Sequence, residues 1–151
     1  MTSILMVCLG NICRSPLAHG LLESKLPPDS FYVDSAGTAN YHIGSLPDQR
    51  SIAVAKTHGI DISNQCGRQF NVSDFDTFDY IYVMDHSNFK NILKLARNPH
   101  DITKVKLLLD FDTTSQIKEV PDPYYDKISG FENVFKLLDN ATDFIANQLS
   151  R

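Results

Sequence analysis

The sequence predicts an α/β fold, namely a single three-layer domain in which helices cover both faces of a four-stranded parallel sheet. A chain of 151 residues is long enough to bury a sizeable core without disulfides or metals. Short apolar runs alternate with segments of helical periodicity, a pattern typical of βαβ units. We find no internal repeat, low-complexity tract or linker. Residues 1–151 are therefore expected to form one domain.

The first strand is predicted at residues 3–8, SILMVC, because a continuous apolar run suits a strand buried on both faces. A helix is expected to follow, with Pro16 at its first position, where a missing N–H costs nothing. Apolar side chains recur at helical spacing until Pro27 ends this helix. A second short strand is expected at residues 31–37, FYVDSAG.

The rest of the chain continues the alternation of strands and helices. Ser129 and Glu132 fit a capping box that would open a final helix, after which apolar residues line one face. Gly59 is suited to end an earlier helix as its C-cap. The intervening elements are, in chain order, a helix at about 47–58, a strand at 79–85, a helix at about 87–97 and a strand at 105–110.

Composition and charge exclude several classes of function. The net charge is −4, and the 14 Lys and Arg residues are scattered, which argues against nucleic-acid and membrane-surface partners. The N-terminus, MTSILMVC, has no positively charged region, and its apolar run is too short for secretion or for crossing a bilayer. Three cysteines without framework spacing indicate free thiols in a reducing compartment. A cytoplasmic location is therefore expected.

The loop CLGNICRS at residues 8–15 is the strongest candidate site, because ligands in such folds bind beyond the carboxyl ends of the strands. Gly10 permits close backbone approach, and Asn11 adopts left-handed angles more readily than most residues. Converging N–H groups at the start of a helix bind an oxyanion. Arg14 adds a planar fork that suits two phosphate oxygens. The rival Walker loop requires a Gly-Lys-Ser/Thr sequence, which this loop does not contain.

Cys8 is the candidate nucleophile of this loop. A helix N-terminus and a neighbouring cation favour the thiolate over the thiol. Ser15 could donate its hydroxyl to the same sulfur. The loop would thus hold an electrophilic phosphate and ionise the group that attacks it.

A cysteine nucleophile also requires an acid, because a phenolate or alkoxide leaves poorly without a proton. Spacing does not choose among the candidate carboxylates. Asp122 is favoured because the prolines on both sides of it hold its backbone in a defined direction. The candidates are Asp85, Asp110, Asp112, Asp122 and Asp126.

Four segments resemble the low-molecular-weight protein tyrosine phosphatases, and the resemblance covers essentially the whole chain: CLGNICRSP, DSAGT at 34–38, FDYIYVMD at 78–85 and VPDPYY at 120–125. It implies an acid phosphatase that hydrolyses phosphotyrosine and other aryl phosphate monoesters through a cysteinyl-phosphate intermediate. No metal or other cofactor is implied. The implied partners are phosphotyrosine-containing proteins, and a monomer is expected, with a weak dimer as the alternative.

The resemblance also implies roles for individual residues. Asp122 is implied as general acid and then general base, beside the catalytic pair Cys8 and Arg14. Ser35 is implied to hydrogen-bond Asn11 and so support the loop, together with Ser15. The expected phosphate-binding residues are Leu9, Gly10, Asn11, Ile12, Cys13 and Arg14, and the expected cleft walls are Tyr41, Tyr124 and Tyr125.

Cys13 lies five residues after Cys8, and both side chains could point into the same small loop. The resemblance implies a reversible Cys8–Cys13 disulfide that protects the nucleophile from over-oxidation. A purely structural Cys13 is the alternative. Cys66 is assigned no role, and the five histidines show no metal-ligand spacing.

Three other functions are weaker interpretations of the same residues. Thiol-dependent arsenate reductases share the Cys-x5-Arg loop but need further downstream cysteines, whereas this chain has Cys66 alone after the loop. Protein-arginine phosphatases typically have threonine at the position of Ile12 and lack the paired tyrosines. A phosphate-binding module without turnover would need neither the Cys8 thiolate nor the Asp122 acid.

Overall fold

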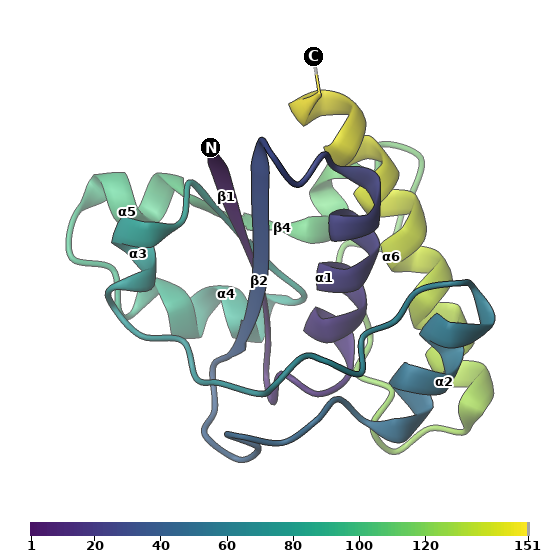
Figure 1. Cartoon of the computed structure of the whole chain (residues 1–151). Coiled ribbons are helices and arrows are strands. Elements are labelled where there is room, and N and C mark those ends of the chain that lie inside the picture. Colours follow the sequence, from purple (N-terminus) through teal and green to yellow (C-terminus); the bar gives the residue numbers. More distant parts are fainter. Residues whose placement is uncertain (151) are drawn as a thin grey trace.

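The computed structural model describes residues 1–150 and shows a four-stranded sheet between two layers of helices (Figure 1). Every pair of neighbouring strands is parallel, in the order β2-β1-β3-β4. The predicted fold class is confirmed. The strands are β1 (Thr2–Cys8), β2 (Phe31–Gly37), β3 (Tyr80–Val83) and β4 (Val105–Leu107), and the helices are α1 (Arg14–Lys25), α2 (Gln49–Thr57), α3 (Asp74–Thr77), α4 (His86–Leu93), α5 (Pro99–Thr103), the 3-10 turn η1 (Leu108–Phe111) and α6 (Ile128–Leu149).

Strand β1 is buried on both faces, and alternate residues enter different cores. Ile4 and Met6, with Cys8, pack in the core that α1, α2 and α6 cover. Leu5 and Val7 pack in the second core, against α4 and the segment that contains α3. Successive side chains of a strand point to opposite faces, so this alternation places Cys8 on the α1 side of the sheet.

The order of the strands places the loop after β1 at a switch point of the sheet. From β1 the chain crosses through α1 to β2 on one side, whereas β3 and β4 lie on the other side. Connections that leave in opposite directions open a crevice beyond the carboxyl ends of the strands. The segment between Cys8 and α1 lies there.

Several boundaries differ from the predictions. The helix expected at about 87–97 is shorter, because α4 ends at Leu93, and a further helix that was not predicted, α5, begins at Pro99. The Asn98 side chain caps α5 by accepting from the Asp101 amide at 2.9 Å. Proline fits there because the first-turn N–H groups need no intrahelical partner. The four-residue helix α3 was not predicted.

The predicted capping box of the last helix is wrong. Helix α6 begins at Ile128, so Ser129 and Glu132 lie inside its first turns, and the N-cap residue Lys127 makes no side-chain cap. Gly59, by contrast, follows the C-cap of α2 with a φ of 80°, as its assignment to the end of that helix requires. Among the described residues, none of the helices has the length and apolar composition to cross a membrane.

Candidate active site

Asn11 is the one non-glycine residue between 1 and 150 with a positive φ, 58°. A left-handed residue other than glycine costs about 1–3 kcal/mol unless its surroundings hold it. Two hydrogen bonds do so here. The side-chain Nδ2 of Asn11 donates to Ser15 Oγ at 2.8 Å, and the side-chain Oδ1 accepts from the Arg68 backbone amide at 3.1 Å. The strained angle turns the loop back over Cys8.

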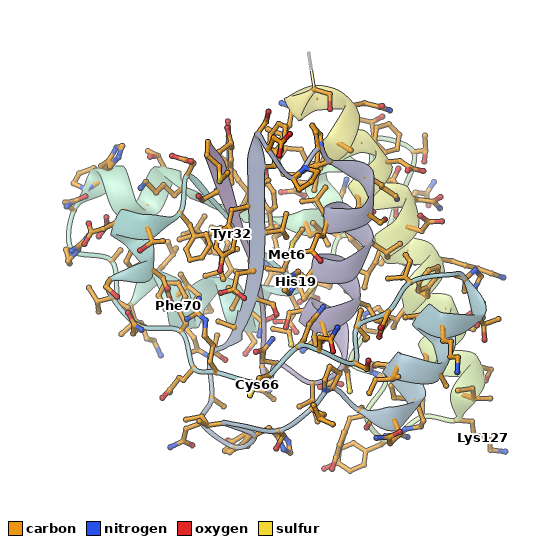
Figure 2. All side chains as sticks on the ribbon, in the orientation of Figure 1. Met6, His19, Tyr32, Cys66, Phe70 and Lys127 are labelled. Atoms are coloured by element: carbon orange, nitrogen blue, oxygen red, sulfur yellow. The ribbon has the colours of Figure 1, made fainter. Side chains whose placement is uncertain are left out.

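The expected hydrogen bond between Ser35 and Asn11 is wrong. Ser35 Oγ lies 3.1 Å from Nδ1 of His19, a buried residue of α1 that Figure 2 places between α1 and the sheet. The strand register explains the difference, because Ser35 is level with Met6 and not with Cys8. Two residues of strand separate these levels by about 7 Å, so Ser35 lies below the loop.

The sulfur of Cys8 is enclosed by hydrogen-bond donors. The residue is 2% exposed, and its Sγ accepts from the Asn11 backbone amide at 3.3 Å. Ser15 Oγ lies 3.0 Å from the same sulfur. Because this hydroxyl already accepts from the Asn11 side chain, its single hydrogen is free to point at Sγ. Donors aimed at a sulfur stabilise its anionic form.

Several backbone N–H groups of the loop are available to bind a ligand. In the part of the chain that the structure describes, the amides of Leu9, Gly10 and Ile12 donate to no other protein group. The backbone carbonyls of Cys8 and Leu9, by contrast, accept hydrogen bonds from the amides of the two residues after β2, both at 2.9 Å. The loop is thus fixed by its carbonyls and keeps its N–H groups for an anion.

Arg14 is 2% exposed and is held by groups from two other segments. Its Nη1 donates to Asp85 Oδ2 at 2.6 Å and to the Val120 carbonyl at 3.0 Å. Burial works to lower the pKa of Arg14, but the charges of Cys8 and Asp85 outweigh it and raise that pKa. The guanidinium therefore stays charged beside Cys8.

Asp122 faces Arg14 across the mouth of the site. Its Oδ2 lies 3.7 Å from Arg14 Nη2, and its Oδ1 accepts from the Tyr124 amide at 3.1 Å. The side chain is 42% exposed, so solvent can reach the carboxyl. Of the five candidate carboxylates, Asp122 is the one that lines the cavity.

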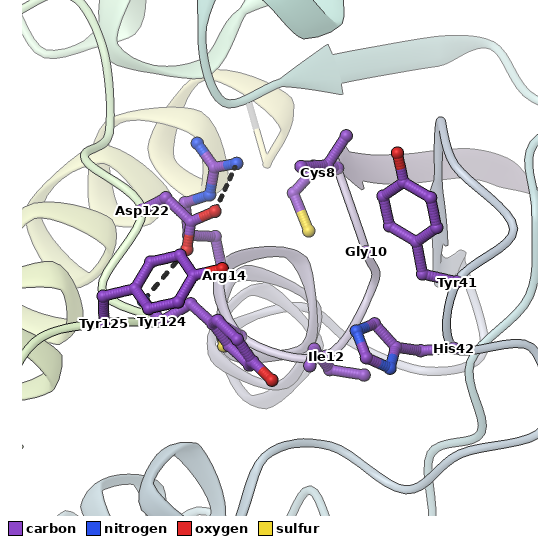
Figure 3. A pocket seen from close by; sticks show the side chains of 11 residues that line it. Cys8, Gly10, Ile12, Arg14, Tyr41, His42, Asp122, Tyr124 and Tyr125 are labelled. Atoms are coloured by element: carbon purple, nitrogen blue, oxygen red, sulfur yellow. Dashed lines mark hydrogen bonds and ion pairs between the residues drawn. The ribbon is translucent and has the colours of Figure 1, made fainter.

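A cavity of about 300 Å³ unites the predicted site residues (Figure 3). Cys8 and Arg14 lie at its base, and Tyr41 stands on one side with Tyr124 and Tyr125 on the other. Of the predicted residues, Asn11, Ser15 and Ser35 do not line the cavity. The lining residues are Cys8, Leu9, Gly10, Ile12, Cys13, Arg14, Tyr41, His42, Asp122, Tyr124 and Tyr125.

Two residues near Cys8 and Arg14 have roles that the sequence did not predict. His42 lines the cavity, with its ring 6.5 Å from the ring of Tyr41 and 6.3 Å from that of Tyr124, centroid to centroid. Because His42 follows Tyr41, which was predicted to line the cleft, its position in the sequence could have predicted this location. Asp85 was considered only as an acid, whereas it pairs with Arg14 and caps α4 through the Asn88 amide at 2.8 Å.

The other cysteines differ from Cys8 in their surroundings. Cys13 is buried, and burial, with the nearby charges of Asp48 and Cys8, raises its pKa to about 12. Cys66 is exposed and does not line the cavity (Figure 2). Within residues 1–150, no three His, Cys, Asp or Glu side chains are grouped to hold a metal ion.

The parallel sheet and its Cys-x5-Arg loop are features of a class of phosphatases, and comparisons with known proteins specify the family. The sequence model of the low molecular weight phosphotyrosine protein phosphatases matches residues 3–151. The human protein of that name is 41% identical over 140 residues, covering 89% of this chain and 87% of its own. The chain belongs to this family and is a protein-tyrosine phosphatase, as the sequence motifs indicated.

Solved structures agree with this assignment. A protein tyrosine phosphatase from Entamoeba histolytica superposes with a TM-score of 0.95 at 36% identity, covering 99% of this chain and 97% of that one. Wzb from Vibrio vulnificus, solved in complex with benzylphosphonate, gives a TM-score of 0.87 at 31% identity, covering 97% and 98%.

Proposed function

We propose that this protein hydrolyses phosphotyrosine and related aryl phosphate monoesters through a cysteinyl-phosphate intermediate on Cys8. Asp122 serves as the general acid and base, and neither a metal nor another cofactor takes part. One observation carries the proposal: Cys8, Arg14 and Asp122 line a single cavity, in which Asp122 Oδ2 lies 3.7 Å from Arg14 Nη2.

In the first step the Cys8 thiolate attacks phosphorus, forming an S–P bond as the P–O bond to the aryl group breaks. Asp122, protonated in this step, gives its proton to the departing oxygen, so the leaving group departs as a neutral phenol. Loop amides and the Arg14 guanidinium stabilise the charge on the non-bridging oxygens of the transition state. The Asp85 carboxylate holds the guanidinium in place.

In the second step water attacks the phosphorus of the cysteinyl phosphate. Asp122, now ionised, accepts a proton from that water, the new P–O bond forms and the S–P bond breaks. The products are inorganic phosphate and the Cys8 thiolate, with Asp122 protonated again. Ser15 supports the leaving sulfur through its 3.0 Å contact.

The aromatic rim supports selection of aryl over alkyl phosphates. Tyr41 and Tyr124 flank the cavity, and their exposed fractions of 71% and 39% leave ring surface available for a substrate ring. Benzylphosphonate bound to the related Wzb is an aryl-bearing phosphate analogue. Phosphoserine has no aromatic ring to contact these tyrosines.

The same proposal includes the substrates, the oligomeric state and the cellular location of the enzyme. Phosphotyrosine-containing proteins are the substrates, and residues 1–151 work as one phosphatase domain. We infer a monomeric cytoplasmic enzyme that needs neither nucleic acid nor a membrane. Peroxide inactivates it reversibly by forming a disulfide between Cys8 and Cys13, which line the same cavity.

The test is turnover of a panel of phosphotyrosine, phosphoserine and phosphoarginine by the wild type and by Cys8→Ser. The wild type should release phosphate chiefly from phosphotyrosine, and rapid acid quenching should trap a phosphorus adduct on Cys8. Cys8→Ser should bind phosphate, seen as thermal protection, without turnover. Preference for phosphoarginine, or protection without turnover in the wild type, would overturn the proposal.

A further inference from the structure

The Arg50 side chain donates four hydrogen bonds near the site, yet it does not line the cavity. We propose that Arg50 is a positioning residue that holds the segment carrying Asp122, residues 120–126, over the phosphate loop. This inference rests on the proposed function, because it assigns Arg50 to the proton-transfer part of that reaction.

The segment has few other anchors. Before Asp122 it is held at Val120, whose amide donates to the Met84 carbonyl at 2.8 Å and whose carbonyl accepts from Arg14. Between Pro121 and Tyr125, the one hydrogen bond to another element within the described residues comes from Arg50. Its Nη2 donates to the Tyr124 carbonyl at 2.9 Å.

Arg50 also contacts both sides of the turn that follows Asp122. Its Nη1 donates to the Asp126 carbonyl at 3.0 Å, so one guanidinium spans two carbonyls of the segment. The same group lies over the ring of Phe131, 4.4 Å from the centroid, and 5.8 Å from that of Tyr124. The planar fork of arginine allows these contacts at once, whereas a lysine ammonium could not reproduce them.

Asp48 fixes Arg50 and links it to the phosphate loop. The carboxylate accepts from Arg50 Nε at 3.0 Å and from Nη2 at 2.9 Å. The Asp48 backbone amide donates to the Ile12 carbonyl at 2.8 Å. The pair therefore connects the loop around Cys8 to the segment around Asp122 through a short, charged path.

This path matters because proton transfer depends steeply on the placement of the acid. A displacement of about 1 Å in a catalytic group can cost roughly a hundredfold in rate. Phosphate binding does not depend on Arg50, since the loop amides and Arg14 have their own supports. Loss of Arg50 should therefore impair protonation of the leaving group and leave affinity for phosphate unchanged.

The experiment compares kcat/KM for phenyl phosphate, whose leaving group needs a proton, with that for 2,4-dinitrophenyl phosphate, whose leaving group does not. Arg50→Ala should lower the first by about 10- to 100-fold and the second by less than about threefold. Its inhibition constant for inorganic phosphate should match that of the wild type. Arg50→Lys should show the same selective loss, because it retains charge without the fork.

Two further variants complete the test. In an Asp122→Ala background, Arg50→Ala should add less than about a twofold loss, because the two residues act in one step. Arg97→Ala is the matched control, since Arg97 is likewise paired with carboxylates, Asp76 and Asp101, and lies 6.0 Å from the Phe75 ring, away from the cavity. It should lower the Tm without any dependence on the leaving group.

The outcomes separate the inference from the function on which it rests. Equal losses for both substrates in Arg50→Ala and Arg50→Lys, or full additivity with Asp122→Ala, would overturn the positioning role. If Asp122→Ala itself shows no dependence on the leaving group, the general-acid assignment in the proposed function fails instead.

Discussion

Arg14 and Asp85 form a 2.6 Å ion pair that joins the loop after β1 to the residue that caps α4. The carboxylate thus fixes the orientation of a buried guanidinium whose other nitrogen faces Asp122. Asn is a good helix cap, so Asp85→Asn keeps the cap of α4 and removes the charge that holds Arg14.

Asp85→Asn should lower kcat/KM for p-nitrophenyl phosphate by about 10- to 100-fold and weaken inhibition by phosphate, because the guanidinium loses its alignment. Urea unfolding should show a loss of about 1.5–3 kcal/mol for a hydrogen bond to a charged group. Asp76→Asn, at the exposed pair with Arg97, is the control and should destabilise the protein less than Asp85→Asn does. Unchanged phosphate affinity in Asp85→Asn would contradict the orienting role.

Ser15→Ala removes a donor to the Cys8 sulfur and the acceptor of the Asn11 amide. Alkylation of Cys8 by iodoacetate should be slower, because the anionic sulfur loses a hydrogen-bond donor. The second step should slow as well, because the departing sulfur loses its donor. Ser51→Ala is the control, since its hydroxyl makes a longer bond, 3.4 Å, to the Cys13 carbonyl. Equal alkylation rates for Ser15→Ala and the wild type would refute this role.

Gly37→Ala should damage the site through the backbone. A methyl at Gly37 would lie 2.7 Å from the Leu9 carbonyl oxygen and 3.1 Å from the Asn11 amide nitrogen. Gly37 itself cannot retreat, because its N–H and C=O both bond to the segment after α2. Activity should fall at least about tenfold and stability by about 1–3 kcal/mol.

The control for this variant is Gly59→Ala. Gly59, unlike Gly37, has a positive φ, and a methyl there meets nothing within 4 Å. That variant should lose stability from backbone strain and keep the wild-type kcat. A fully active Gly37→Ala would show that the loop tolerates a shift at this contact.

The raised pKa of Cys13, about 12, predicts how the disulfide depends on pH. Below that value the thiol stays protonated, so its thiolate fraction grows tenfold with each unit of pH. After a short peroxide pulse that oxidises Cys8, mass spectrometry should show disulfide formation accelerating by about tenfold per pH unit above neutrality. Cys66→Ser should behave as the wild type.

Cys13→Ser tests the protective role directly, since its Cys8 should proceed to sulfinic and sulfonic acid. Over-oxidation at the same rate in the wild type would contradict protection by Cys13.

The burial of Cys13 also makes the free energy of unfolding depend on pH. The folded state disfavours the Cys13 thiolate. The protonated Cys13 thiol therefore contributes to the free energy of unfolding in full below its ordinary pKa of 9.0, and this contribution is lost as the pH rises toward 12.

The sequence predicted the fold and the loop because both depend on local patterns. An apolar run ending at Cys8, a Gly-Asn turn and a proline near the start of a helix are local patterns, and together they predicted the loop in which Cys8 and Arg14 line one cavity. Several predicted boundaries were wrong, since α1 begins at Arg14 and not at Pro16, α4 ends at Leu93, β4 ends at Leu107 and α6 begins at Ile128.

Tertiary structure alone decided which distant residues meet. Proline stiffness favoured Asp122 among five carboxylates, but its proximity to Arg14 depends on how the chain returns from β4 to α6. Ser35 bonds His19 instead of Asn11 because strand register, which no local pattern specifies, sets its height in the sheet. Arg50 reaches the segment around Asp122 from the first turn of α2, and His42 lines the cavity from the turn after β2. Local propensity fixes an element, whereas partners across the fold are selected by the summed packing of all elements.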